Sequence, residues 1–300
     1  MKIVLGTVQF GIEYGIANQT GRVQLEDVHN IFQLATSNGV DTLDTAIAYG
    51  DSESTLGQVG VNGWSVVTKL SAIPEGCVDV AGWVEAQIDD SLKRLGISQL
   101  HGVLLHRPKQ LLGEHGKSLY EALQHLKVQG ITRKVGVSVY APEELDMLPG
   151  TMQFDLVQAP LNILDRRLVE SGWAKKLKEQ GTELHVRSAF LQGLLLMPAG
   201  KRPEKFERWN SVWSEWSRWL GETGLTPLQA CLGYVMAIKE VDKVVVGVDS
   251  ITQLKEIFAA SHSTLPSLPS LPSLPSLPSL PSWPRPIHTD LINPGRWSDL

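Results

Sequence analysis

Short apolar runs alternate with longer amphipathic stretches about eight times along the chain. The runs are rich in Val, Ile and Leu, which is typical of strands buried on both faces of a parallel sheet. We therefore expect eight strands, at residues Lys2–Leu5, Thr42–Asp44, Ser65–Lys69, Leu100–Leu105, Lys134–Ser138, Leu156–Gln158, Glu183–Val186 and Val244–Val246.

The stretches between these runs have the spacing of helices. Within residues 26–37, the apolar residues Val28, Ile31, Phe32 and Ala35 recur at i, i+3, i+4 and i+7. A second helix, Val80–Leu95, is predicted to end at Gly96, where a glycine commonly closes a helix. The sequence Thr-Pro-Leu-Gln at 226–229 is typical of a capping box and opens a helix that we expect to end near Lys239.

Eight strand–helix units leave two main architectures, a closed barrel and an open sheet with helices on both faces. No Gly-x-Gly-x-x-Gly pattern follows the first strand, so the open dinucleotide-binding sheet lacks its main signal. We therefore predict an α/β fold, a parallel eight-stranded (β/α)₈ TIM barrel. Such barrels of about 250 residues commonly form one domain.

A repeat of different character follows the predicted barrel. Residues 265–282 are six tandem Leu-Pro-Ser triplets, in which proline excludes both a helix and a central strand. We expect an extended polyproline II spacer there. The chain is thus divided into a barrel at 1–262, a Pro-rich linker at 263–283 and a C-terminal segment at 284–300. Trp283, Ile292 and Trp297 would dock this end of the chain on the barrel.

Composition restricts the partners and the cellular location. A net charge of −5 argues against nucleic acid or an anionic membrane as the main partner, because both require clustered positive charge. No run approaches the ~20 apolar residues of a membrane span, and the N-terminus does not resemble a signal peptide. Cys77 and Cys231 read as two reduced thiols of a cytoplasmic protein. No metal site is predicted, and the oligomeric state stays open.

Polar residues stand at the carboxyl ends of three successive predicted strands. Asp44 ends the second strand, Lys69 ends the third and His106 follows the fourth, while Tyr49 lies five residues after Asp44. In a (β/α)₈ barrel these ends share one rim, where active sites are built. Together they supply an acid–base tyrosine, a cation beside it, a carboxylate to hold the cation and a histidine to orient a polar substrate.

Taken singly, each of these residues could have a structural role instead of a catalytic one. Asp44 could cap a helix, Lys69 could reach solvent from a strand end, and His106 could be structural. Their joint position on one rim is what favours a catalytic site.

The surrounding motifs resemble the aldo-keto reductase family. Residues 44–57, Asp-Thr-Ala-Ile-Ala-Tyr-Gly-Asp-Ser-Glu followed by Leu-Gly, are similar to the first signature of that family. Further similar segments are Val67-Thr68-Lys69, Leu104–Pro108, Gly136–Ser138 with Pro142, Gln158 with Leu161-Asn162, and Gly247–Ser250 with Gln253 and Glu256. The likeness spans about residues 1–260.

The resemblance implies that the protein reduces the carbonyl group of a small-molecule aldehyde or ketone with NADPH or NADH. Tyr49 would be the general acid, Lys69 would lower the pKa of its hydroxyl, Asp44 would pair with Lys69, and His106 would orient the carbonyl. A sugar or small aldehyde is the substrate class expected from the family.

The resemblance also implies a set of cofactor-binding residues: Thr7, Ser138, Gln158, Arg187, Ser188, Gly193, Gly247, Asp249, Gln253 and Glu256. Ser138 and Gln158 would hold the nicotinamide carboxamide, and Thr7 would lie near the ribose. The segment 247–253 would receive the adenosine phosphate end at the start of a helix near Ile251.

Three positions depart from the family pattern. Val139 replaces an asparagine that would bind the carboxamide, and Arg187 aligns with the aromatic residue that stacks on the nicotinamide, as a planar guanidinium also can. Asp249 stands where members that use NADP have Arg or Lys. A carboxylate repels a 2′-phosphate and accepts a hydrogen bond from a free ribose hydroxyl, so we expect weak NADP preference or use of NAD.

Two other functions are compatible with such a barrel. One is a lyase in which Lys69 forms a Schiff base, which requires a neutral lysine that Asp44 disfavours. The other is a non-catalytic, nicotinamide-binding regulatory barrel.

Overall fold

Eight parallel strands close into a barrel in chain order, from β1 beside β2 around to β8 beside β1, in the computed structural model of the chain. The structure describes residues 1–262, 280, 281, 283 and 287–300. The strands are β1 (Ile3–Gly6), β2 (Thr42–Asp44), β3 (Ser65–Leu70), β4 (Leu100–Leu105), β5 (Thr132–Ser138), β6 (Leu156–Pro160), β7 (Glu183–Arg187) and β8 (Lys243–Gly247). The predicted (β/α)₈ barrel is confirmed.

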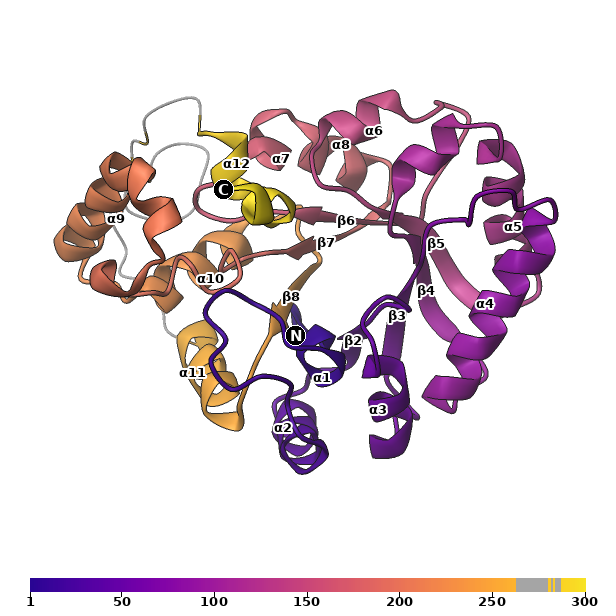
Figure 1. Ribbon diagram of the computed structural model, residues 1–300, viewed down its shortest axis with the longest axis horizontal. Helices are drawn as coiled ribbons and strands as arrows, with labels where there is room; N and C mark the ends of the chain where they lie inside the picture. Colours follow the sequence, from indigo (N-terminus) through magenta and orange to yellow (C-terminus); the bar gives the residue numbers. More distant parts are fainter. Residues whose placement is uncertain (263–279, 282, 284–286) are drawn as a thin grey trace.

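Helices follow the strands and surround the barrel (Figure 1). They are α1 (Val8–Gly11), α2 (Leu25–Ser37), α3 (Ser52–Val59), α4 (Val80–Leu95), α5 (Gly116–Val128), α6 (Glu143–Met147), α7 (Arg167–Glu170), α8 (Trp173–Glu179), α9 (Asn210–Thr223), α10 (Pro227–Ala237), α11 (Ile251–His262) and α12 (Thr289–Ile292). Short 3₁₀ helices lie at Pro108–Leu112, Ala199–Lys201, Glu204–Trp209 and Pro294–Asp299.

The strands bury side chains on both faces, which is why their sequences are so uniformly apolar. Outside the barrel, strand residues such as Leu43 and Val103 pack with the inner faces of the helices in one continuous core. Val67, Leu104 and Leu156 form a separate buried cluster. Because β6 pairs with neither β3 nor β4, this second cluster fills the barrel interior.

The predicted helix signals agree with the helix ends. The carboxylate of Asp79 caps α4 at its start, and Gly96 adopts the left-handed conformation at its end. At α10, the side chain of Thr226 accepts a hydrogen bond from the backbone of Gln229, whose own side chain accepts one from the backbone of Thr226. This is the capping box predicted from the sequence.

The connection from β7 to β8 is long and rich in tryptophan, and the C-terminal segment packs against it. The ring of Trp297 lies edge-on to Phe206, and that of Trp283 lies 6.2 Å from Trp216. The indole of Trp283 also donates to the carbonyl of Ile163, after β6. Trp283, Ile292 and Trp297 are all buried. The predicted polyproline II spacer lies almost entirely outside the described residues.

Among the described residues, no helix is both long and apolar enough to cross a membrane.

Candidate active site

The predicted site residues lie at the carboxyl ends of the strands. Five of them are at or beside such an end, namely Asp44, Lys69, Ser138, Gln158 and Arg187. His106 directly follows β4, and Tyr49 lies five residues after the end of β2. The register places Ser138 opposite Gln158, and the residue after Gln158 opposite Val186. The predicted residues therefore share one rim, as the topology of the barrel requires.

Lys69 is the centre of this group. Its ammonium, fully buried, donates to Oδ1 of Asp44 at 2.6 Å, to the backbone carbonyl of Thr45 at 2.9 Å and to the hydroxyl of Tyr49 at 3.4 Å. Nζ also lies 5.0 Å from the centre of the Tyr49 ring. Burial alone would lower the pKa of Lys69, but Asp44 and Tyr49 outweigh it and raise the pKa above its usual value. The lysine is therefore held as an ammonium.

His106 completes the rim beside Tyr49. The two rings are 5.9 Å apart and nearly perpendicular. Burial, and then the positive charges of Lys69 and Arg187, lower the pKa of His106 to about 4. The imidazole is thus neutral near pH 7, and one of its nitrogens carries a proton that can be donated to an oxygen atom.

Gln158 and Ser138 form a hydrogen-bonded chain that ends on Asp44. The amide nitrogen of Gln158 donates to Oδ2 of Asp44 at 2.6 Å, and the hydroxyl of Ser138 donates to Oε1 of Gln158 at 3.3 Å. Both side chains are buried.

Thr7 joins β1 to the segment that follows β2. Its hydroxyl is fully buried, donates to the backbone carbonyl of Asp44 at 3.0 Å and lies 2.9 Å from Oγ of Ser52. Ser52 in turn donates to the carbonyl of Thr7 at 2.8 Å. The side chain of Thr7 therefore fastens β1 to the segment that carries Tyr49.

Glu53 anchors the helix that follows Tyr49. It is buried and accepts hydrogen bonds from Thr68, Ser91 and Arg94 at 2.6, 3.0 and 2.8 Å, which belong to β3 and α4. Ser52 and Glu53 both belong to the motif that resembles the family signature, and both have structural roles here.

Arg187 and Tyr140 form the next part of the rim. The guanidinium lies over the Tyr140 ring, 4.6 Å from its centre, and donates to the carbonyl of Val139 at 3.0 Å and to Oγ of Ser188 at 3.3 Å. Tyr140 thus occupies one face of the arginine. The sequence interpretation did not include Tyr140, because no motif singles out the second residue after the β5 serine.

The loop after Arg187 has an unusual backbone. Ser188, Leu191 and Gln192 have positive φ angles of 61°, 49° and 52°, and Gly193 has a φ of 85°. Positive φ angles are uncommon for non-glycine residues, and residues that adopt them cluster at active sites and ligand-binding loops. The side chain of Gln192 donates to the hydroxyl of Tyr14, in the loop after α1.

The same loop after α1 also reaches the end of β8. Nδ2 of Asn18 donates to Oδ1 of Asp249 at 3.2 Å. Gln253 accepts from the backbone of Asp249 at 2.8 Å and donates to its Oδ2 at 3.4 Å. Burial raises the pKa of Asp249. Glu256 is exposed on α11.

Gln9 was missed by the sequence interpretation. Its side chain lies against Gly247, where an added Cβ would come within 2.6 Å of both amide atoms. Oε1 of Gln9 is buried, and no described residue donates a hydrogen bond to it. A glutamine one turn after β1 gives no signal in the sequence, because only the closed barrel brings β1 beside β8.

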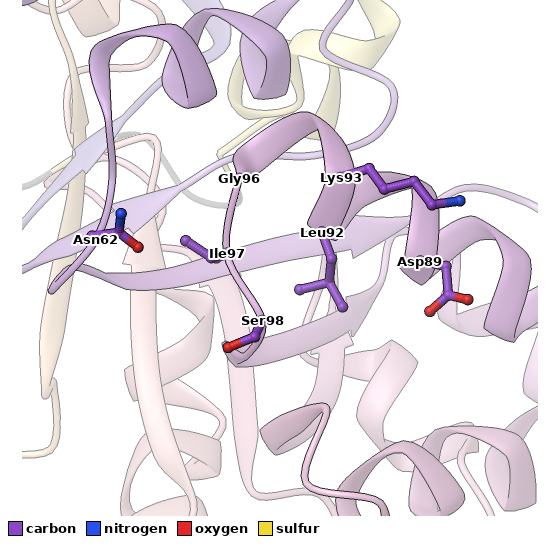
Figure 2. A pocket seen from close by; sticks show the side chains of 7 residues that line it. All are labelled: Asn62, Asp89, Leu92, Lys93, Gly96, Ile97 and Ser98. Atoms are coloured by element: carbon purple, nitrogen blue, oxygen red, sulfur yellow. The ribbon is translucent and has the colours of Figure 1, made fainter.

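A hollow of about 690 Å³ lies elsewhere on the molecule (Figure 2). It is lined by Asn62 before β3 and by Lys93 and Ser98 around the end of α4. These residues lie at the amino ends of the strands, which in barrels of this kind serve stability. The hollow is therefore separate from the site.

The sequence profile of the Aldo/keto reductase family matches residues 2–268. An L-galactose dehydrogenase of Arabidopsis thaliana is 29% identical over 258 residues, which cover 80% of this chain and 79% of the relative. An aldo-keto reductase of Mycobacterium sp. (strain KMS) is 33% identical over 131 residues, 41% of this chain and 45% of the relative. Among solved structures, the holo form of an aldo-keto reductase from Bacillus halodurans has a TM-score of 0.68 at 22% identity, covering 88% of this chain and 87% of the other.

Proposed function

Because the chain belongs to the aldo/keto reductase family, we propose that it reduces an aldehyde or ketone to the alcohol by hydride transfer from NADPH or NADH. The observation that supports this most directly is the ammonium of Lys69 within hydrogen-bond distance of both Tyr49 and Asp44. Such a group is suited to protonating an oxygen atom at the rim.

The residues of the rim fit a nicotinamide dinucleotide. Oε1 of Gln9 is a buried acceptor for which the described residues supply no donor, and it lies beside Gly247 at the end of β8. The first turn of α11 follows directly, and a helix start offers free backbone N–H groups to phosphate. We expect Arg187, Ser188 and Gly193 to hold the nicotinamide side, and Gly247, Asp249 and Gln253 the adenosine side. Glu256 stays an expected contact.

The cofactor, when bound, supplies the hydride. In the proposed reduction, the hydroxyl of Tyr49 donates its proton to the carbonyl oxygen as the carbon is reduced. The charge of Lys69 stabilises the phenolate that forms, and Asp44 keeps that charge beside the tyrosine. The neutral His106 donates a hydrogen bond to the same carbonyl oxygen and so orients the substrate.

The lyase alternative is disfavoured by the state of Lys69. A Schiff base forms from a neutral amine, whereas Asp44 and Tyr49 raise the pKa of this buried lysine. Trapping with borohydride and substrate distinguishes the two activities. A regulatory, non-catalytic barrel would bind NADPH or NADH without turning over any aldehyde.

For the cofactor, we propose that Asp249 disfavours NADP, because a carboxylate at this point repels a 2′-phosphate. The side chain already accepts hydrogen bonds from Asn18 and Gln253. The same carboxylate would accept a hydrogen bond from a free ribose 2′-hydroxyl.

We expect the substrate to be a sugar or a small aldehyde, the class expected from the family. Because one relative is an L-galactose dehydrogenase, sugars are the first compounds to test. A cytoplasmic location is part of the proposal, and both Cys77 and Cys231 are free thiols. The test is a screen of aldehydes and sugar lactols with NADH and NADPH, followed by loss of absorbance, with Tyr49→Phe as control. Turnover by the parent protein and not by the variant is the expected result.

A further inference from the structure

A second hollow, of about 270 Å³, lies within the connection from β7 to β8. It is lined by residues of the segment 199–207 and by one face of α9, and we call it the Arg202 hollow. Two of the lining rings, those of Phe206 and Trp213, are buried. None of the residues expected to bind the cofactor or the carbonyl group lines it, so the hollow is distinct from the rim.

Arg202 is the one cation among the residues that line this hollow. Its guanidinium lies over the ring of Trp213, 4.5 Å from the ring centre, and Nη2 donates to the backbone carbonyl of Met197 at 3.0 Å. A guanidinium has five N–H donors, and within the described part of the chain this carbonyl is their only acceptor. Nε is buried and has no partner there. Most of the hydrogen-bonding capacity of Arg202 is therefore unused.

The charge of Arg202 also lacks a counter-ion within the described residues. Burial lowers the pKa of the guanidinium, and no neighbouring carboxylate raises that pKa again. Two other partly buried arginines are paired, Arg94 with Glu53 and Arg167 with Asp165. A partly buried charge without a partner is costly, so an oxyanion that enters the hollow from solvent would be stabilised by Arg202.

The remaining polar side chains of the hollow restrict the kind of anion. They are Glu207 and, spaced at i, i+4 and i+7 on α9, Asn210, Ser214 and Ser217. Within the described residues these four side chains make no hydrogen bond or ion pair with the protein. They offer donors and acceptors that match the hydroxyl groups of a ligand. The carboxylate of Glu207 disfavours an anion of higher charge, such as phosphate, more than a carboxylate with a single charge.

We propose that the Arg202 hollow binds a small organic acid that carries hydroxyl groups. The carboxylate of the acid accepts hydrogen bonds from Arg202, whose planar guanidinium matches its geometry, and the hydroxyl groups pair with Glu207 and with the side chains of α9. A purely structural role for Arg202, closing the turn after Met197, would use only one of its five donors. The proposal is independent of the proposed reduction, because no residue of the rim takes part in it.

The first experiment titrates the parent protein with gluconate by calorimetry at constant ionic strength. Three comparison probes separate the parts of the ligand: sorbitol has the hydroxyl groups without the carboxylate, acetate has the carboxylate without the hydroxyl groups, and inorganic phosphate is a different oxyanion. We expect gluconate to bind with a Kd about tenfold lower than that of each comparison probe. Failure of gluconate to bind at millimolar concentration, or equal binding of acetate or phosphate, would overturn the proposal.

Arg202→Met removes the charge and keeps a long side chain over Trp213. The Kd of gluconate should rise about tenfold or more, because the hydrogen bonds to its carboxylate are lost. Arg208→Met is the matched control, since Arg208 also lies over a tryptophan, 4.3 Å from the ring centre of Trp209, but does not line the hollow. Its Kd should stay within about twofold of the parent value. Equal weakening in both variants would show a general effect of net charge and would contradict the assignment to Arg202.

Ser214→Leu tests the hollow without changing Arg202, and it provides the measurement if Arg202→Met does not fold. The larger side chain fills the space beside the guanidinium and should abolish binding of gluconate. Ser211→Leu is the matched control, because Ser211 is exposed on the same helix and does not line the hollow. Unchanged affinity in Ser214→Leu would exclude this hollow as the binding site.

The titration with gluconate is repeated in the presence of saturating NADPH. Because the hollow and the rim share no residue, the Kd of gluconate should change less than about twofold. Competition between gluconate and NADPH would place the acid at the rim and overturn the proposal of a separate site. If the parent protein reduced no carbonyl compound, the proposed function would fail, and these titrations would still decide whether the Arg202 hollow binds the acid.

Discussion

The ammonium of Lys69 lies 3.4 Å from the hydroxyl of Tyr49, and Asp44 holds that ammonium from the other side at 2.6 Å. A single buried charge therefore links the strand-end carboxylate to the phenol at the rim.

Tyr49→Phe should lower kcat by a factor of about 10² to 10⁴, because the variant keeps the ring and loses the proton donor. Within the described residues, the hydroxyl of Tyr49 is hydrogen-bonded only to Lys69, so the fold should persist. Steady-state kinetics and a far-UV circular dichroism spectrum test both statements. Unchanged turnover would exclude Tyr49 as the acid.

Lys69→Met should destabilise the protein by about 3–5 kcal/mol, since it leaves Asp44 as a buried charge without its cation. The double variant Asp44→Asn/Lys69→Met removes both charges and should be more stable than the single variant. Urea unfolding of the parent, both single variants and the double variant measures the coupling. Additive losses would show that the pair does not interact.

The stability of the protein should depend on pH through His106. Its pKa is lowered to about 4 in the folded state from 6.5, so between these values the unfolded chain binds more protons than the folded one. The free energy of unfolding should therefore rise with pH from 4 to 6.5, by about 3 kcal/mol at most, and change no further above 6.5 through this group. His106→Asn should reduce the rise in the free energy of unfolding, which is measured with urea at pH 4.5 and at pH 7.5. Equal rises in the parent protein and in the variant would contradict the assignment.

Asp249→Ser should shift the cofactor preference toward NADPH by about tenfold, because removing the carboxylate removes its repulsion of the 2′-phosphate, and such repulsion between partly exposed charges is worth roughly 1–2 kcal/mol. Fluorescence titration with NADPH and NADH gives the ratio of the two Kd values. Asp27→Ser, on the exposed side of α2, is the matched control. A strong NADPH preference in the parent protein would already refute the role given to Asp249.

Gly11→Ala should impair both stability and catalysis. An added Cβ would lie 1.8 Å from the carbonyl oxygen of Tyr49 and 2.5 Å from the backbone nitrogen of Ser52, so the segment carrying the tyrosine must move. Overpacking of this kind costs about 1–3 kcal/mol or more, and a displacement of ~1 Å at a catalytic group can cost about 10²-fold in rate. Gly150→Ala, where a Cβ meets nothing within 4 Å, is the control for thermal unfolding and kcat.

The sequence predicts the barrel well because each strand is a local apolar run and each helix has its own periodicity and caps. All eight strands lie within two residues of their expected ends, and the capping box at Thr226 is present as expected. The grouping of Asp44, Lys69 and His106 follows from the same argument, since strand ends in a barrel share a rim.

The contacts between distant side chains could not be predicted in this way. Gln158 contacts Asp44 across 114 positions, and Asn18 contacts Asp249 across 231. Both depend on side-chain directions inside a closed barrel and on the path of a loop, for which no local pattern in the sequence exists. The same is true of Gln9, whose partner is a glycine on the last strand.

The roles of Ser52 and Glu53 affect what can be inferred when the family signature is found in another protein. Both belong to the stretch by which the family is recognised, yet one ties that stretch to β1 and the other ties it to β3 and α4. A descendant that had lost every trace of reductase chemistry would still need them to fold. The presence of the stretch therefore locates Tyr49, whereas the proposed catalysis also requires Lys69 and His106, which lie outside the stretch and can change without altering it.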